Sequence, residues 1–63
     1  MNELNSKMNE MMQTLIATAV DVEKFEQGNK SAGTRIRKAM QEIKNLAQEV
    51  RVEVQEIKNG ALV

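Results

Sequence analysis

The chain has 63 residues and a net charge of zero, because nine Lys and Arg side chains balance nine Asp and Glu side chains. It contains no Cys, His, Trp, Tyr or Pro, which excludes disulfides, catalysis by thiolate or imidazole groups, and the usual zinc ligand sets. A chain this short forms one domain at most and buries little of its surface on folding, so we expect self-association to stabilise it.

The composition also limits the functional class. No apolar run approaches the ~20 residues that a membrane span needs, and no segment has the pattern of a signal peptide, so we expect a cytoplasmic protein. Leu, Met, Ala, Glu, Gln, Lys and Arg dominate, which favours helices. We expect an all-α protein that is not an enzyme, that holds no cofactor or metal, and that has no small-molecule substrate.

The first half of the chain predicts a helix over residues 2–26. Its apolar residues recur at steps of three and four, which is typical of one helix face: Leu4, Met8, Met11, Leu15, Val22 and Phe25. Four more apolar residues widen this face beyond half the circumference: Met12, Ile16, Ala19 and Val20. Asn2 is the predicted N-cap, and Gly28 is predicted to end the helix in a left-handed conformation.

The second half predicts a helix over residues 30–58, with three apolar positions per heptad, the pattern of a bundle helix. These positions are Ile36, Ala39, Met40, Ile43, Leu46, Ala47, Val50, Val54 and Ile57. Asn29 or Ser31 is the predicted N-cap, and Gly60 is predicted to follow the last turn. Gly33 costs about 1 kcal/mol inside a helix, which predicts either a close approach to its backbone or local flexibility.

A connection over residues 27–30 makes the two helices antiparallel, so the sequence predicts one helical-hairpin domain over residues 1–63. One partner helix cannot cover the broad apolar belt of the first helix. Two hairpins packed through that belt can, which predicts a homodimeric four-helix bundle or coiled coil. The predicted interface consists of Met8, Met11, Met12, Leu15, Ile16, Ala19, Val20, Ile36, Met40 and Ile43.

The second helix repeats its charges every seven residues. Five bases occupy one flank of the apolar stripe: Lys30, Arg37, Lys44, Arg51 and Lys58. The opposite flank carries Glu42, Glu49 and Glu56, with Arg35 at the equivalent position near the turn. The spacing indicates a helix from Lys30 onward. Such charges either pair within a bundle or contact phosphate, and periodicity alone leaves both roles open.

Positive charge collects around the turn. Residues 24–44 carry six bases and two acids, a net of +4, whereas residues 1–23 carry one base and four acids, a net of −3. The N-terminus of the second helix adds a partial positive charge and free N–H groups that favour an anion. The predicted DNA-contacting residues are Lys24, Lys30, Ser31, Thr34, Arg35, Arg37, Lys38 and Lys44. Ser31 has the alternative role of a helix cap only.

The stretch GNKSAGTRIRK, residues 28–38, resembles the bacterial histone-like family typified by the chlamydial linker-histone-like nucleoid protein. The resemblance covers roughly residues 23–58, and the matching positions are Gly28, Asn29, Lys30, Ala32, Arg35 and Arg37. It implies a small α-helical protein that binds and compacts DNA in the nucleoid. Those relatives owe much of their DNA affinity to a Lys/Ala/Pro-rich tail, and these 63 residues contain none. We therefore expect modest, steeply salt-dependent affinity.

Three functions remain in competition. The favoured one is DNA binding through the phosphate backbone with little sequence preference, because the basic segment has no aromatic side chain to stack on bases. The second is a helical-hairpin scaffold whose charges only fix the register of an oligomer. The third is a small regulator that binds another protein's helix through apolar residues of the first helix.

Overall fold

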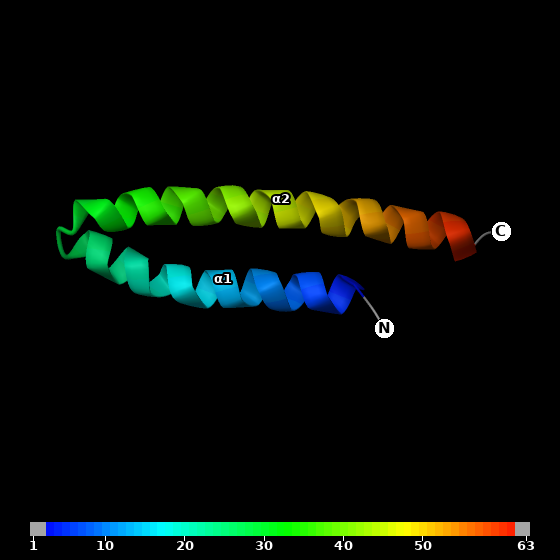
Figure 1. Cartoon of the computed structure of the whole chain (residues 1–63), viewed down its shortest axis with the longest axis horizontal. Helices are drawn as coiled ribbons and strands as arrows, with labels where there is room; N and C mark the ends of the chain where they lie inside the picture. The colour runs from blue at the N-terminus through cyan, green and yellow to red at the C-terminus, as the bar shows by residue number, and fades with distance from the viewer. Residues whose placement is uncertain (1–2, 62–63) are drawn as a thin grey trace.

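The computed structural model describes residues 3–61, which form two long helices lying side by side (Figure 1). Helix α1 covers Glu3–Glu26 and helix α2 covers Lys30–Ala61. The two helices run antiparallel and pack against each other, and no strand occurs in the described part of the chain. The predicted all-helical fold is therefore confirmed. The predicted cap at Asn2 lies outside the described residues.

A glycine in the left-handed conformation ends α1. Gly28 has a φ of 103°, which L-residues with a side chain rarely adopt. Its N–H donates to the Phe25 carbonyl at 3.0 Å, and the N–H of Asn29 donates to the Lys24 carbonyl at 3.0 Å. This pair of bonds satisfies carbonyls that the helix end would otherwise leave without partners. The role predicted for Gly28 is confirmed.

Asn29 caps α2. Its Oδ1 accepts a hydrogen bond from the N–H of Ala32 at 3.3 Å, and the hydroxyl of Ser31 donates to the same oxygen at 2.7 Å. Ser31 therefore supports the cap from inside the first turn. At the other end, α2 continues through Gly60, so the prediction that Gly60 follows the last turn is wrong.

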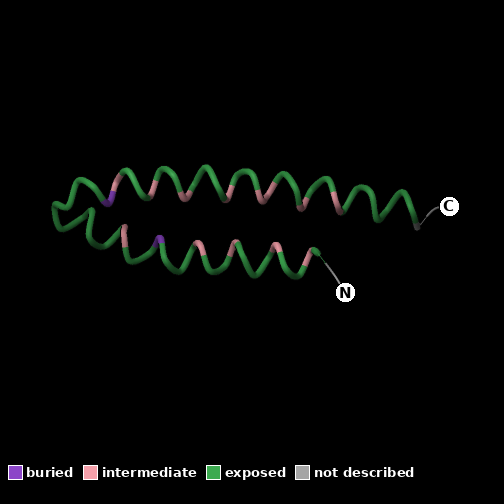
Figure 2. The backbone as a smooth tube through the Cα atoms, in the orientation of Figure 1, coloured by how far each residue is buried: buried purple, intermediate pink, exposed green. Residues whose placement is uncertain are grey.

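The face that α1 turns toward α2, marked by the pink and purple positions of α1 in Figure 2, has only two apolar residues among those described, Leu4 and Met11. Its buried and half-buried residues recur at steps of three and four along the helix: Leu4, Lys7, Met11, Thr14, Thr18 and Asp21. Met8, Leu15 and Val22, which the sequence places on one apolar face with Met11, are exposed by 46%, 50% and 39%. The hairpin thus leaves much of the apolar belt of α1 in solvent.

Helix α2 contributes the more apolar side of the contact. Its buried and half-buried residues include Ala32, Gly33, Ile36, Ala39, Ile43, Leu46, Ala47, Val50 and Glu53. Ala32 is fully buried and Thr18 is 5% exposed, and no other described residue is buried to that degree. The described part of the hairpin therefore has a thin core.

Gly33 lies under the ring of Phe25. A Cβ placed on Gly33 would stand 2.8 Å from Cε1 of the ring, closer than carbon atoms approach without displacement. Of the two explanations that the sequence offered for a glycine here, the structure supports the close approach.

Two sets of ion pairs fix the register of the helices. Near the turn, Nη2 of Arg35 lies 2.9 Å from Oδ1 of Asp21. Near the open end, Nζ of Lys7 lies 3.7 Å from carboxylate oxygens of both Glu49 and Glu53. This register leaves the last turns of α2 extending past the start of α1 (Figure 1).

Candidate nucleic-acid interface

The two broad sides of the hairpin differ in character. On one side, Val22 and Phe25 of α1 share a shallow groove with Gly33 and Arg37 of α2. On the opposite side, Lys7 of α1 lies beside carboxylates of α2. Residues seven apart stay on the same side of a helix in such a pair, so each side can be followed along its length.

The first side is an apolar face made by both helices. From α1 it contains Met8, Met12, Leu15, Ala19 and Val22, and from α2 it contains Met40, Ala47 and Val54. Met8, Met12, Leu15 and Val22 are 39–53% exposed, and Met40 and Val54 are 42% and 40% exposed. Ile16 and Val20, which were also predicted to lie in an oligomer interface, point to the outer side of α1 and are exposed by 63% and 52%. Met11, Ile36 and Ile43 are half-buried within the hairpin itself.

A row of bases borders the apolar face along α2. Lys30 and Arg37 line the groove that also contains Val22, and Lys44 and Arg51 line a hollow around Ala47. We call Lys30, Arg37, Lys44, Arg51 and Lys58 the base row. All five are exposed, and none pairs with a carboxylate among residues 3–61. Neighbouring members are about 10 Å apart along the helix, at 1.5 Å of rise per residue.

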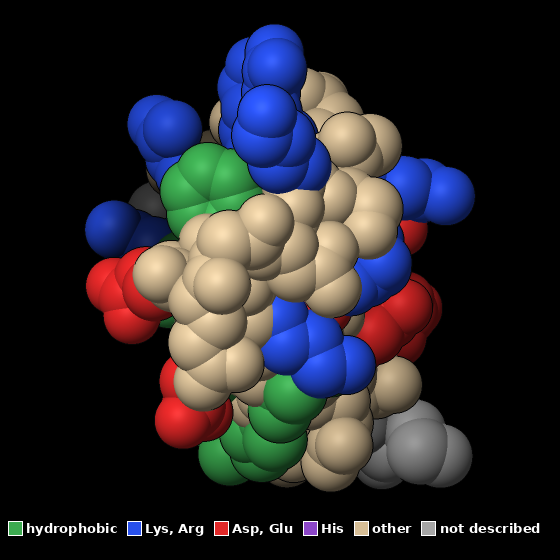
Figure 3. All heavy atoms as spheres, turned by 90° about the vertical axis from the view of Figure 1, so that its left-hand side faces the viewer, with side chains coloured by type: hydrophobic (Ala, Val, Ile, Leu, Met, Phe, Trp, Pro, Cys, Tyr) green, Lys and Arg blue, Asp and Glu red, His purple; other side chains and the backbone are tan. Residues whose placement is uncertain are grey.

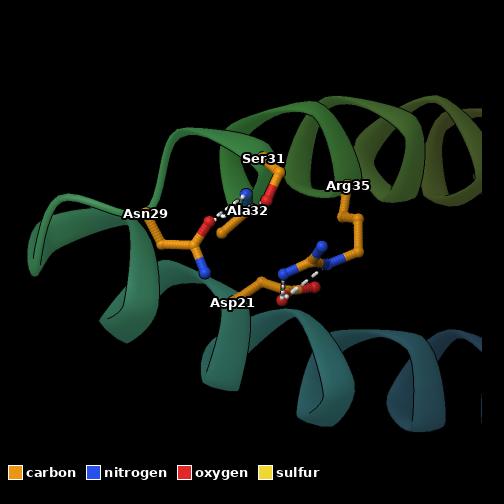
Figure 4. Close-up of polar contacts among 5 residues, drawn as sticks. All are labelled: Asp21, Asn29, Ser31, Ala32 and Arg35. Atoms are coloured by element: carbon orange, nitrogen blue, oxygen red, sulfur yellow. Dashed lines mark hydrogen bonds and ion pairs between the residues drawn. The ribbon is translucent and has the colours of Figure 1, made fainter.

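Arg35 lies on the other side of α2 and already has a partner. Its Nε donates to Oδ1 of Asp21 at 2.9 Å, which ties the start of α2 to the last turns of α1 (Figure 4). Its side chain is 48% exposed, while that of Asp21 is 20% exposed. Of the predicted DNA-contacting bases, Arg35 is the one whose side chain forms an ion pair within the described hairpin.

The remaining predicted residues are spread around the hinge end. Lys24, Lys38 and Thr34 are exposed, and the heptad positions place Lys24 and Lys38 on the side opposite the base row. Seen end on, Lys and Arg side chains surround the hinge end with carboxylates among them (Figure 3). Ser31 is exposed, but its hydroxyl is engaged with Asn29. The predicted residues are therefore distributed over several sides of the hinge end, and three of them, Lys30, Arg37 and Lys44, belong to the base row.

Reasoning from the sequence missed the pairing of Lys7. This base sits between Glu3, Glu49 and Glu53 at 3.7–3.9 Å, with 21% of its side chain exposed. The signal was present, because Lys7 falls three residues after Leu4 and four before Met11, on the step that marks a packed face. A charged residue at such a position indicates a partner across the contact.

The described residues offer no other chemistry. No group of three metal-binding side chains comes together between residues 3 and 61. Neither described helix has an apolar stretch sufficient to cross a membrane. The described residues thus form a small helical hairpin with an exposed row of bases along α2.

Comparison with known proteins identifies the family. The family model described as histone H1-like protein Hc1 matches residues 2–60, nearly the entire chain. The chain therefore belongs to the histone H1-like Hc1 family, whose members are DNA-binding proteins of the nucleoid and not enzymes, and the resemblance seen in the sequence is confirmed. No curated protein and no solved structure shows significant similarity to the chain.

Proposed function

We propose that this protein binds DNA without sequence preference through the base row, mainly through Lys30, Arg37 and Lys44 near the hinge. The observation that carries the proposal is that these bases are exposed, evenly spaced and without carboxylate partners in the described part of the chain. Lysine and arginine in such a row neutralise phosphates and release counterions. Membership in the histone H1-like Hc1 family favours DNA as the negatively charged partner of these bases.

The binding test is a fluorescence anisotropy titration of a labelled duplex of mixed sequence over a series of salt concentrations. Affinity should fall steeply with salt, with a slope of about 0.9 per phosphate contact. The double variant Arg37→Gln and Lys44→Gln should lower this slope by about two units and weaken binding equally for unrelated sequences.

The double variant Arg51→Gln and Lys58→Gln is the matched control, because it removes two charges from the same row but far from the hinge. It should retain most of the wild-type affinity. Equal losses from the two double variants would show that only net charge matters. Wild-type binding by the Arg37 and Lys44 variant would reject the proposed contact residues.

We further propose that the protein acts as a self-associated assembly through the apolar face. A face with exposed Met8, Met12, Leu15 and Val22 on a 63-residue chain is more apolar than a soluble monomer needs. Pairing would add the core that the single hairpin lacks. The same face also supports the competing scaffold function, in which assembly occurs and DNA is not bound.

Two equally exposed apolar residues of α1 make a matched pair of variants. Leu15 is 50% exposed on the apolar face, and Val20 is 52% exposed on the outer side of the helix. In sedimentation equilibrium at micromolar concentration, Leu15→Glu should shift the protein to monomer, because it would bury a carboxylate, whereas Val20→Glu should stay assembled. A monomeric wild-type protein would reject self-association, and an assembled protein without DNA affinity would establish the scaffold function.

A further inference from the structure

The apolar face allows two symmetric ways to pair with a second copy. In one arrangement the two hinges lie at opposite ends, and α1 lies along α1 of the second copy while α2 lies along α2. In the other the hinges lie at the same end, and each α1 lies along α2 of the second copy. All neighbouring helices are antiparallel in both arrangements, so helix packing alone does not choose between them.

The base row distinguishes the two arrangements. With the hinges at opposite ends, the base row of one copy runs beside the base row of the other, and Lys44 lies close to its own symmetry mate. The positive charges of both rows then border one contact between two helices, and like charges held together are destabilising. The described part of α2 has no carboxylate on this side to compensate, because Glu42, Glu49 and Glu56 follow the opposite flank with Arg35.

With the hinges at the same end, the base row meets a different set of side chains. The corresponding edge of α1 presents Asn5, Met12, Ala19 and Glu26, which include no base. Glu26 already lines a groove with Lys30 and Arg37 of its own chain. In the register set by the ion pairs, Glu26 of one copy comes level with Lys30 of the other, so the acid adds to the attraction across the contact.

The side-chain sizes favour the same arrangement. The α1 row of the apolar face is bulky, with Met8 and Leu15, whereas the α2 row has the small Ala47 between Met40 and Val54. Large side chains interdigitate best with a row that contains a small one. If the hinges lay at opposite ends, Leu15 of one copy would instead meet Leu15 of the other copy. The hairpin measures 54 × 17 Å across its broad side, a size compatible with the ~800 Å² that each partner contributes to a stable interface.

We infer that two copies pair through the apolar face with both hinges at the same end, so that each α1 covers α2 of the other copy. The inference rests on the self-association proposed above and adds its geometry. Both hinge ends, with Lys30 and Arg37 of each copy, are then presented together at one end of the dimer. One dimer offers this end to one duplex, and its opposite end is not a second hinge site that could bridge to another duplex.

Spin labels on single cysteines measure the orientation directly, because the natural chain has no cysteine. Gln27→Cys marks the hinge and Gln55→Cys marks the open end, and both positions are exposed. Double electron–electron resonance on the assembled protein should give short label separations at both positions, because the two labels of each pair lie level with each other across a bundle whose packed axes are 8–10 Å apart. Opposite hinges centred on Leu15 would give about 36 Å or more at each position, from 1.5 Å per residue.

A label at Gln41→Cys is the control for pairing itself. Gln41 is exposed and level with Leu15, so its separation stays within about 40 Å in either arrangement. Short separations at Gln27 and Gln55 would establish the inferred geometry. Long separations at both, with a measurable one at Gln41, would overturn it while leaving self-association intact. A wild-type protein that sediments as a monomer would instead remove the proposed self-association and the inference together.

Discussion

The guanidinium of Arg35 contacts a single carboxylate oxygen of Asp21 through both Nε and Nη2, each at 2.9 Å (Figure 4). This contact joins two residues that are 14 positions apart in the sequence and brackets the turn between them. It joins the two helices and engages one of the bases near the hinge within the fold. The two effects can be separated by removing the acid and not the base.

Asp21→Asn should therefore change stability and DNA binding in opposite directions. The free energy of unfolding should fall by about 0.5 kcal/mol, because partly exposed ion pairs contribute little. DNA affinity should rise, since Arg35 becomes available to phosphate. Glu23→Gln is the control, because it removes the same charge two residues away without touching Arg35. Urea unfolding and duplex titrations measure both effects, and equal DNA affinities for the two variants would contradict the role given to Arg35.

The ion pair at the open end should respond differently, because it is more buried. Oε2 of Glu53 is buried and accepts no hydrogen bond from the described residues, and its contact with Lys7 at 3.7 Å is too long to be one. Lys7→Met should lower the free energy of unfolding by about 1–3 kcal/mol, because it leaves a partly buried carboxylate without its base.

Adding Glu53→Leu to Lys7→Met should restore at least wild-type stability, since an apolar pair can replace a partly buried ion pair without loss. Urea unfolding followed by circular dichroism measures both variants. A double variant that is less stable than Lys7→Met would show that Glu53 stabilises the hairpin through something other than Lys7.

The cap of α2 gives a third prediction. Asn29→Ala removes the acceptor for the Ala32 N–H and should cost about 1 kcal/mol of unfolding free energy. Ser31→Ala removes only the hydroxyl that donates to Asn29, so it should cost a few tenths of a kcal/mol. If Ser31→Ala lowers DNA affinity at unchanged stability, its hydroxyl contacts phosphate as the sequence suggested. A larger stability loss from Ser31→Ala than from Asn29→Ala would contradict the assignment of the cap.

Gly33→Ala tests the contact with Phe25. Alanine favours the helix by about 1 kcal/mol, but its Cβ would displace the ring that lies 2.8 Å from it. We expect these effects to offset each other in the wild type, so that stability changes little. In a Phe25→Ala background the displacement is gone, and Gly33→Ala should stabilise by about 1 kcal/mol. The double-mutant cycle is measured by urea unfolding, and an equal gain in both backgrounds would show that the ring does not restrict position 33.

The hairpin and its turn follow from the order of residues along the chain. Two helical periodicities separated by a glycine leave few alternatives, because a connection of three residues returns the chain on itself and only glycine readily supplies the left-handed residue. The seven-residue spacing of Lys30, Arg37 and Lys44 likewise places these bases on one side of any helix that contains them. These features could be predicted because each depends only on the spacing of residues within one segment of the chain.

The side of α1 that packs against α2 depends instead on how the two helices fit together. Hydropathy favoured the stripe through Met8, Leu15 and Val22, yet the hairpin packs the stripe through Lys7, Thr18 and Asp21. Thr18 is 5% exposed, and Lys7 and Asp21 form ion pairs with Glu49 and Arg35 of α2. Pairwise fit of this kind links residues far apart in the sequence, so the periodicity of one helix does not reveal it.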